Sequence, residues 1–219
     1  MPSSDHAALA VYDLDGVVTR KDSFTALLGE HLGRLPLRMM PATPAAVRWI
    51  GSGRRPDVRT DALRRISEVA LAGLTDDGYS RLAARVGTRI GRDPSWVRPE
   101  VVERIRREHA EGTRIVIATA SEHRLAEALL HAAGVPFDLL SASRIESGPA
   151  GLRVADHRIG VRKAEALQQS GVDLGRATFA TDSFSDLPTA RLAARVVLVG
   201  ATRRTRARFA AAWIDAESL

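Results

Sequence analysis

The stretch Val11–Thr19, VYDLDGVVT, ends an apolar run with two carboxylates and a glycine. The residues from Ala7 to Tyr12 are apolar throughout, which is typical of a buried strand. Asp13 and Asp15 point to the same side of an extended chain, but at a frayed strand end the second can turn away and offer its main-chain carbonyl. Two oxygens of different kinds can then meet one hard cation, as Mg²⁺ prefers. Asp and Gly also favour turns, so an ordinary turn is the alternative interpretation.

The size and composition predict a globular protein. The chain has 219 residues, 45% of them hydrophobic, which fits one domain or a domain with a smaller one inserted. It has no run of about 18 apolar residues, and its N-terminus lacks the pattern of a signal peptide. It has no cysteine, which excludes disulfides, thiolate metal sites and a cysteine nucleophile. We therefore expect a cytoplasmic protein, a monomer or a homodimer, with no membrane partner.

The charge is basic, with a net value of +6. Basic side chains are scattered, often at helical spacing beside Glu, which is typical of solvated helix faces. No aromatic interleaving or recognition motif accompanies them, so we expect no nucleic-acid partner. Only Lys21 and Lys163 of the 32 basic residues are lysines. In such a chain a lysine indicates a compact point charge where a guanidinium does not fit.

The pattern after the first strand is helical as far as about Pro99. Asp22 and Ser23 are suited to begin a helix by capping its first amides. Further helices are expected over Asp61–Leu71 and over Asp76–Ile90, with broken helices or loops in the Pro- and Gly-rich segment Arg34–Pro56. No convincing strand interrupts this block. We therefore expect a helical cap domain, residues 22–96, inserted into a core formed by residues 1–21 and 97–219.

The pattern beyond Pro99 alternates helices and strands. Helices are expected at 99–112, 122–133, 163–169, 187–193 and 202–212; strands are expected at 114–118, 137–145, 178–180 and 196–199, with a turn or hairpin at 148–153. Because the strands are apolar throughout, they predict an α/β fold with a doubly wound parallel sheet covered on both faces. Ligands bind such sheets at the carboxyl ends of the strands.

Polar side chains follow the expected strands at that edge. A Thr119 hydroxyl and the amides of the next helix, from Ala120 onward, could hold an anion. Taken one at a time, Thr119 could be a plain strand residue, Lys163 a surface lysine and Asp182 a helix cap. Taken together, these interpretations require several coincidences at one sheet edge. The full set at this edge is Asp13, Asp15, Thr119, Ser121, Asp182, Ser183 and Asp186, with Lys163 in the helix GVRKAEAL.

These patches resemble the motifs of the haloacid dehalogenase-like superfamily. The superfamily pattern is Asp-x-Asp, then Thr or Ser after an apolar strand, then Lys, then Asp-x-x-x-Asp, and the resemblance covers nearly the whole chain. A helical cap between the first two motifs, together with DSFSDLP at residues 182–188, is most similar to the branch that contains phosphoserine phosphatase.

The resemblance implies a Mg²⁺-dependent phosphatase that acts on a small phosphorylated metabolite. It implies that Asp13 attacks phosphorus and becomes an aspartyl phosphate, while Asp15 protonates the leaving oxygen and then activates water. Mg²⁺ would be bound by Asp13, the carbonyl of Asp15 and Asp182. Further residues carried over are Thr119, Ala120 and Lys163 for the phosphoryl group, Gly16 in support, and Asp186, which orients Lys163 or a metal-bound water.

Some features leave alternatives open. Thr181 stands where many relatives have Gly or Asp, and Val17 where Thr is commoner, but neither removes a working group. The dehalogenases lack an acid at the position of Asp15, so Asp15 argues against dehalogenation. A phosphotransferase or mutase keeps both acids, and a non-catalytic basic binding module on the same fold is a further alternative.

The cap is expected to select the substrate. Asp22 stands nine residues after Asp13, where phosphoserine-specific relatives have an acid that meets the substrate amine. Asp22 could equally be only a helix cap. Arg54, Arg55 and Arg59 are candidates for a substrate carboxylate or second phosphate, although a solvated loop would also account for them.

Overall fold

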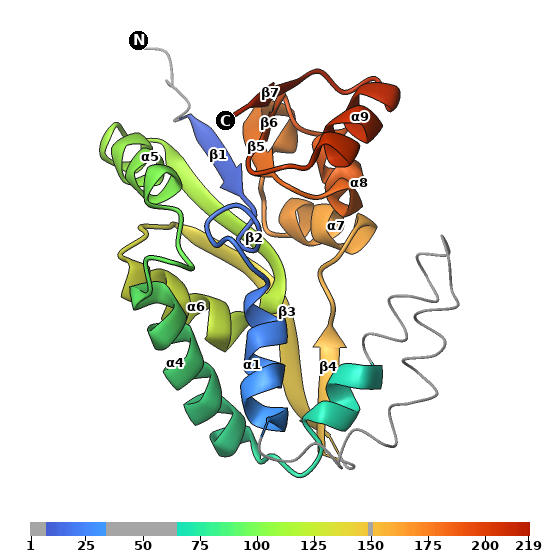
Figure 1. Cartoon of the computed structure of the whole chain (residues 1–219). Coiled ribbons are helices and arrows are strands. Elements are labelled where there is room, and N and C mark those ends of the chain that lie inside the picture. The colour runs from blue at the N-terminus through green and yellow to red at the C-terminus, as the bar shows by residue number, and fades with distance from the viewer. Residues whose placement is uncertain (1–7, 34–64, 149–150) are drawn as a thin grey trace.

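A seven-stranded sheet organises the protein in the computed structural model, which describes residues 8–33, 65–148 and 151–219 (Figure 1). The strand order is β4-β3-β2-β1-β5-β6-β7, and all neighbours are parallel except β3 and β4. The α/β class and the doubly wound core are confirmed. The strands are β1 (Leu9–Tyr12), β2 (Arg114–Glu122), β3 (Leu139–Gly148), β4 (Gly151–Asp156), β5 (Ala177–Thr181), β6 (Arg195–Leu198) and β7 (Ala216–Ser218).

Helices cover both faces of this sheet because successive strand residues point to opposite sides. Tyr12 belongs to an apolar cluster with Ile105, whereas Val11 packs into a second cluster with Leu167 and Phe209. Figure 1 shows α5 and α6 on one side and α7, α8 and α9 on the other. Their bounds are α5 (Pro99–Ala110), α6 (His123–Ala133), α7 (Val161–Gln169), α8 (Leu187–Ala190) and α9 (Arg203–Ala211), with 3-10 turns at Leu174–Arg176 and Phe184–Asp186.

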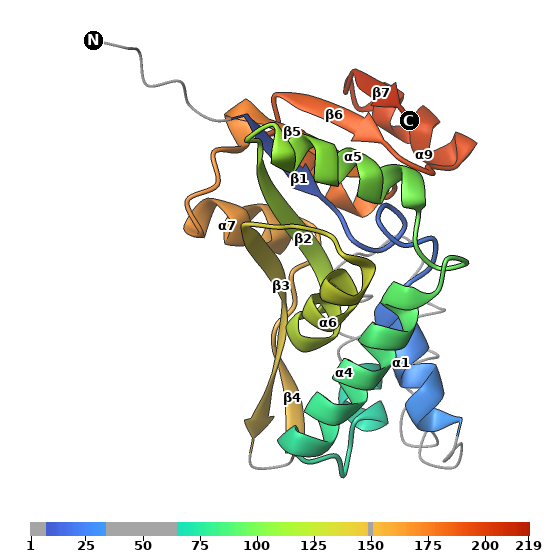
Figure 2. The same cartoon turned by 90° about the vertical axis from the view of Figure 1, so that its left-hand side faces the viewer.

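The described part of the expected insert is helical. It contains α1 (Ser23–Leu32), a helical stretch at 65–70 and α4 (Asp76–Arg92). Figure 2 shows α4 lying along α6, and the same contact is visible in Figure 1. Two glycines allow this approach: a Cβ at Gly87 would lie 2.7 Å from the Leu125 carbonyl, and one at Gly91 would collide with the Leu129 carbonyl. Tyr79 and Ile90 of the expected insert belong to one apolar cluster with Ile105 of the expected core.

The chain leaves and re-enters the core through two paired segments. The amide of Arg20 donates to the carbonyl of Trp96 at 2.7 Å, and the amide of Arg98 donates to the carbonyl of Val18 at 2.9 Å. The Arg98 guanidinium also donates to the carbonyl of Gly16 at 3.3 Å. The return segment therefore stabilises the loop that follows β1.

Several expected boundaries differ from the observed ones. β2 continues beyond Ala118 to Glu122, and the pairing of β2 with β3 shifts register between Thr119 and Glu122. The antiparallel strand β4 departs from a wholly parallel sheet, and the short strand β7, which pairs parallel with β6, adds an edge strand that was not expected. The segment 34–64 lies outside the described residues, and with it all of the broken helices or loops expected over 34–56 and the start of the helix expected over 61–71. No helix in the described ranges has the length and apolar character needed to cross a membrane.

Candidate active site

The end of β1 lies beside the end of β5. Tyr12 pairs with Ala180, and the amide of Asp13 donates to the Ala180 carbonyl at 2.9 Å. This parallel register places Asp13 level with Thr181, one residue before Asp182. The main-chain amide of Leu14 donates to Asp13 Oδ1 at 2.8 Å, which leaves Oδ2 directed toward the lysine described next. The expected convergence of the first and fourth motifs is therefore present.

Lys163 is buried between two carboxylates. Its Nζ lies 3.2 Å from Asp13 Oδ2 and 2.8 Å from Asp186 Oδ1, and its side chain is only 3% exposed. Burial alone would lower the pKa of Lys163, but the charges of Asp13 and Asp186 outweigh it and raise this pKa. The two acids therefore favour the charged form of the lysine, and its compact ammonium group occupies the space between them.

Thr181 orients Asp186. The Thr181 hydroxyl donates to Asp186 Oδ2 at 2.8 Å and accepts from the amide of Ser183 at 3.1 Å. Both Thr181 and Asp186 are buried. A chain of polar contacts thus runs from Thr181 through Asp186 and Lys163 to Asp13. Sequence reasoning treated Thr181 as a tolerated departure, whereas the structure gives it a defined contact.

Asp15 is held by the start of α1 and by β2. Its Oδ1 accepts from the amide of Ser23 at 2.8 Å, and its Oδ2 accepts from the hydroxyl of Ser121 at 2.6 Å. Ser23 Oγ and Ser121 Oγ are 2.9 Å apart. Burial and the nearby charge of Asp22 raise the pKa of Asp15, although the hydrogen bonds from both serines oppose this. The sequence pattern marks Ser121 only as a strand-end residue and Ser23 only as part of a helix start.

Gly16 makes room for Asp182. Gly16 has φ +85°, and a Cβ there would collide with the Asp182 carboxylate. Glycine is required both by the left-handed backbone and by this approach. Burial, followed by the charge of Asp186, raises the pKa of Asp182 to about 6.

The phosphate-binding candidates lie at the end of β2. Thr119 is fully buried, and its Oγ1 accepts from the amide of Ser121 at 3.0 Å, so its own proton remains available to an acceptor. Ala120 lies between them in the same strand, within the irregularity of the β2–β3 pairing. The expected exit into a helix is thus an extended strand end, with Glu122 capping α6.

Asp22 acts as a helix cap. Its Oδ1 accepts from the amide of Thr25 at 2.6 Å, at the start of α1, and its side chain is exposed. Asp22 is therefore in the position of the helix cap that was the alternative to a substrate contact. Its second carboxylate oxygen has no hydrogen bond to the site among the described contacts. Arg54, Arg55 and Arg59 lie outside the described residues.

The charge of the site fits a hard cation. Burial raises the pKa of Asp13 well above its usual range, even though Lys163 opposes this, because Asp186 and Asp15 add further negative charge. Among the described residues, no three His, Cys, Asp or Glu side chains form a ready metal-binding group. A set made of the Asp13 and Asp182 carboxylates with the Asp15 main-chain carbonyl needs no third side chain, and oxygen donors of this kind suit Mg²⁺.

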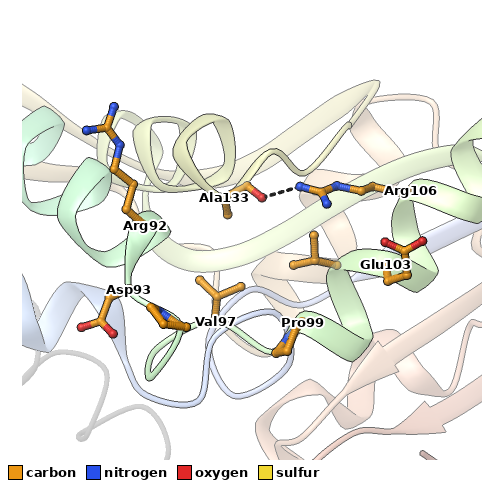
Figure 3. Close-up of a pocket in the computed structure, with 10 residues that line it drawn as sticks. Arg92, Asp93, Val97, Pro99, Glu103, Arg106 and Ala133 are labelled. Carbon is orange, nitrogen blue, oxygen red and sulfur yellow. Dashed lines mark hydrogen bonds between the residues drawn. The ribbon is translucent and has the colours of Figure 1, made fainter.

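A pocket of about 360 Å³ lies elsewhere, where α4 ends and α5 begins (Figure 3). Val97 and Pro99 line it, together with Arg92, Glu103 and Arg106. The Arg106 guanidinium donates to the Ala133 carbonyl at 2.9 Å (Figure 3) and to that of Gly134 at 2.8 Å, so it caps the end of α6. None of the candidate site residues lines this pocket.

The sheet order and the helices on both faces define an α/β protein of the Rossmannoid class, with carboxylates at its strand ends. The family model of haloacid dehalogenase-like hydrolases matches residues 10–191, and the chain belongs to this family. The expected superfamily is therefore confirmed.

Comparisons with individual proteins agree with this family. Protein CicA of Caulobacter vibrioides is 29% identical over 138 residues, which are 63% of this chain and 59% of CicA. The chain thus spans less than two thirds of that relative. A protein of unknown function from Bordetella pertussis Tohama I superposes with a TM-score of 0.74 at 19% identity, covering 96% of this chain and 98% of that one. A phosphoserine phosphohydrolase-like protein from Francisella tularensis SCHU S4 has a TM-score of 0.66 at 14% identity, covering 92% of each chain. The two structures share the fold.

Proposed function

We propose that this protein is a phosphatase that hydrolyses a small phosphomonoester through a phosphorylated Asp13, with Mg²⁺ as its cofactor. The observation that carries the proposal is the contact of Lys163 Nζ with Asp13 Oδ2 at 3.2 Å, because this cation can hold a phosphoryl oxygen beside the nucleophile. Membership of a hydrolase family supports the same reading.

Each residue would have one role. Asp13 Oδ would form a bond to phosphorus while the bond from phosphorus to the ester oxygen breaks, and the Asp15 carboxyl would give its proton to that departing oxygen. Asp15 would then accept a proton from the water that attacks phosphorus, which releases inorganic phosphate and restores Asp13. Thr119, the amides near Ala120 and Lys163 would bind the phosphoryl oxygens.

The cation would be held by the Asp13 and Asp182 carboxylates and the Asp15 carbonyl. When bound, it would reduce the repulsion between a dianionic phosphate and the nucleophilic carboxylate. Asp186 would keep Lys163 in place. Asp22 and the arginines Arg54, Arg55 and Arg59 remain proposals for substrate selection.

The test is phosphate release from a panel of phosphorylated metabolites, with Mg²⁺ or with EDTA. Native protein, Asp13→Asn and the exposed control Asp173→Asn would be compared. We expect metal-dependent release by native protein and the control, and none by Asp13→Asn. Phosphorylated protein that accumulates without phosphate release would favour transfer to a second acceptor, as in a phosphotransferase or mutase. Full activity in Asp13→Asn would overturn the assignment of the nucleophile.

A further inference from the structure

The carboxyl group of Asp15 belongs to a ring of hydrogen bonds formed with two serines. One oxygen accepts the Ser23 amide at 2.8 Å, and the other accepts the Ser121 hydroxyl at 2.6 Å. The two serine hydroxyls are 2.9 Å apart and complete the ring. Because each carboxyl oxygen accepts a hydrogen bond from a different donor, the ring restricts rotation of the Asp15 carboxyl group about its Cβ–Cγ bond.

The direction of each hydrogen bond follows from the donors available. The Ser121 hydroxyl donates its proton to Asp15 Oδ2. Ser121 Oγ can then only accept from its other neighbour, and the Ser23 hydroxyl is the donor. The Thr19 hydroxyl competes weakly for Asp15, since it lies 3.3 Å from Oδ1 and 2.8 Å from the Lys21 carbonyl. Ser121 is therefore the short hydroxyl contact of Asp15.

Both serines are buried inside the site. Ser23 is fully buried and Ser121 is 2% exposed, so water does not readily replace either hydroxyl. The serines come from different parts of the molecule: Ser121 from β2 of the sheet, and Ser23 from the first position of α1. The orientation of Asp15 thus depends on where α1 begins relative to the sheet.

We infer that the Ser23 and Ser121 hydroxyls are positioning residues that hold Asp15 in line with the ester oxygen it protonates. This inference rests on the proposed function, in which Asp15 is the general acid. The two serine hydroxyls would act through Asp15, and neither is among the groups proposed to bind the phosphoryl group or the cation. Their loss should therefore matter most for a reaction that needs the proton.

Two aryl phosphates separate this role from a structural one. The 4-nitrophenolate ion leaves readily without a proton, whereas phenolate leaves much less readily and gains more from general-acid help. The value of kcat/KM includes the transfer of the phosphoryl group to Asp13 but not the later hydrolysis. For Ser121→Ala we expect kcat/KM to fall about 10-fold or more with phenyl phosphate and less than about 3-fold with 4-nitrophenyl phosphate.

Further variants test the pair as a unit. Ser23→Ala should show the same selectivity, and the double variant should lose little more than Ser121→Ala because the hydroxyls form one chain. Ser141→Ala is the matched control: Ser141 is also fully buried on a strand of the sheet, but its hydroxyl contacts Arg158. It should show equal, small changes with both esters. Thermal unfolding of each variant identifies any that do not fold.

The outcomes distinguish the two levels of the proposal. Equal losses with both esters in Ser121→Ala and Ser23→Ala, or no loss in either, would overturn the positioning role and leave the phosphatase proposal intact. If Ser121→Ala does not fold, Ser23→Ala decides between these outcomes by itself. If native protein with Mg²⁺ hydrolyses neither ester nor any member of the metabolite panel, the proposed function fails and this inference fails with it.

Discussion

Lys163 Nζ contacts both carboxylate oxygens of Asp186, at 2.8 and 2.9 Å, although 23 residues separate them in the chain. The same ammonium also lies 3.2 Å from Asp13 Oδ2. One cation thus serves two buried acids, and its removal would leave both without the charge that neutralises them. The same ammonium group therefore stabilises the folded site and contacts the proposed nucleophile.

The variant Lys163→Met should be inactive and less stable. Removing one partner of a buried ion pair costs about 3 to 5 kcal/mol, so we expect the free energy of unfolding to fall by about 3 kcal/mol. Urea unfolding and phosphate release provide the measurements. Lys21→Met is the control, because Lys21 is exposed and lies 5.1 Å from the centre of the Trp96 ring. Equal stability of native protein and Lys163→Met would contradict the buried pairing.

Thr181→Val should loosen Asp186 while preserving the shape of the side chain. The variant loses the 2.8 Å hydrogen bond to Asp186 Oδ2, which should cost about 1.5 to 3 kcal/mol because the acceptor is charged. Thr178→Val on the same strand is the control, since the Thr178 hydroxyl meets only the exposed guanidinium of Arg195 in the described contacts. Chemical unfolding measures the free energy of unfolding of both variants. Equal losses of this free energy would mean that the hydrogen bond to Asp186 does not stabilise the protein.

Gly16→Ala should lower stability and activity together. Gly16 and Gly112 have nearly equal φ values of +85° and +86°, but a Cβ at Gly112 meets nothing within 4 Å. Gly112→Ala therefore measures the backbone strain alone, about 1 kcal/mol. Gly16→Ala adds the collision with Asp182 and should lose at least about 1 kcal/mol more, with phosphate release reduced. Equal losses of stability in Gly16→Ala and Gly112→Ala, with unchanged phosphate release, would contradict the close approach of Asp182 to Gly16.

Asp182 should make the metal-free protein less stable as the pH rises. Its folded pKa of about 6 lies above the usual value, so the folded state holds this proton more tightly than the unfolded state. That contribution is present at about pH 4 and is lost as the pH rises through about 6. In EDTA near pH 7.5, the free energy of unfolding of Asp182→Asn should be about 2 kcal/mol higher than that of native protein. Near pH 4 the two values should differ little. A difference that does not change with pH would contradict the raised pKa.

The packing of α4 on α6 should tolerate no side chain at Gly87. A Cβ there would lie 2.7 Å from the Leu125 carbonyl and 2.9 Å from the Ala128 Cβ, so Gly87→Ala should cost about 1 to 3 kcal/mol. Gly29→Ala on α1 is the control, because it meets nothing within 4 Å and should gain about 0.5 to 1 kcal/mol from helix propensity. Thermal unfolding compares them, and opposite shifts are the expected result.

The sequence determined which residues stand at the strand ends. The apolar run into Asp13, the run into Thr119 and the strand before Thr181 are local patterns, and the chain order of a parallel sheet then places their ends at one edge. The same local logic predicted the helix start at Asp22. It also pointed to Lys163, because lysine is so scarce in this chain.

The tertiary structure alone decided which of these residues touch. Ser23 and Ser121 meet across 98 residues, and no spacing in the sequence predicts a contact of that range. The close approach that requires Gly87, and the short strand β7 at the sheet edge, likewise depend on how elements pack. Local sequence patterns depend on the backbone preferences of neighbouring residues. Contacts between distant residues depend instead on how whole segments pack against one another. The candidate site residues could therefore be named from the sequence, but the groups that hold them in position could not.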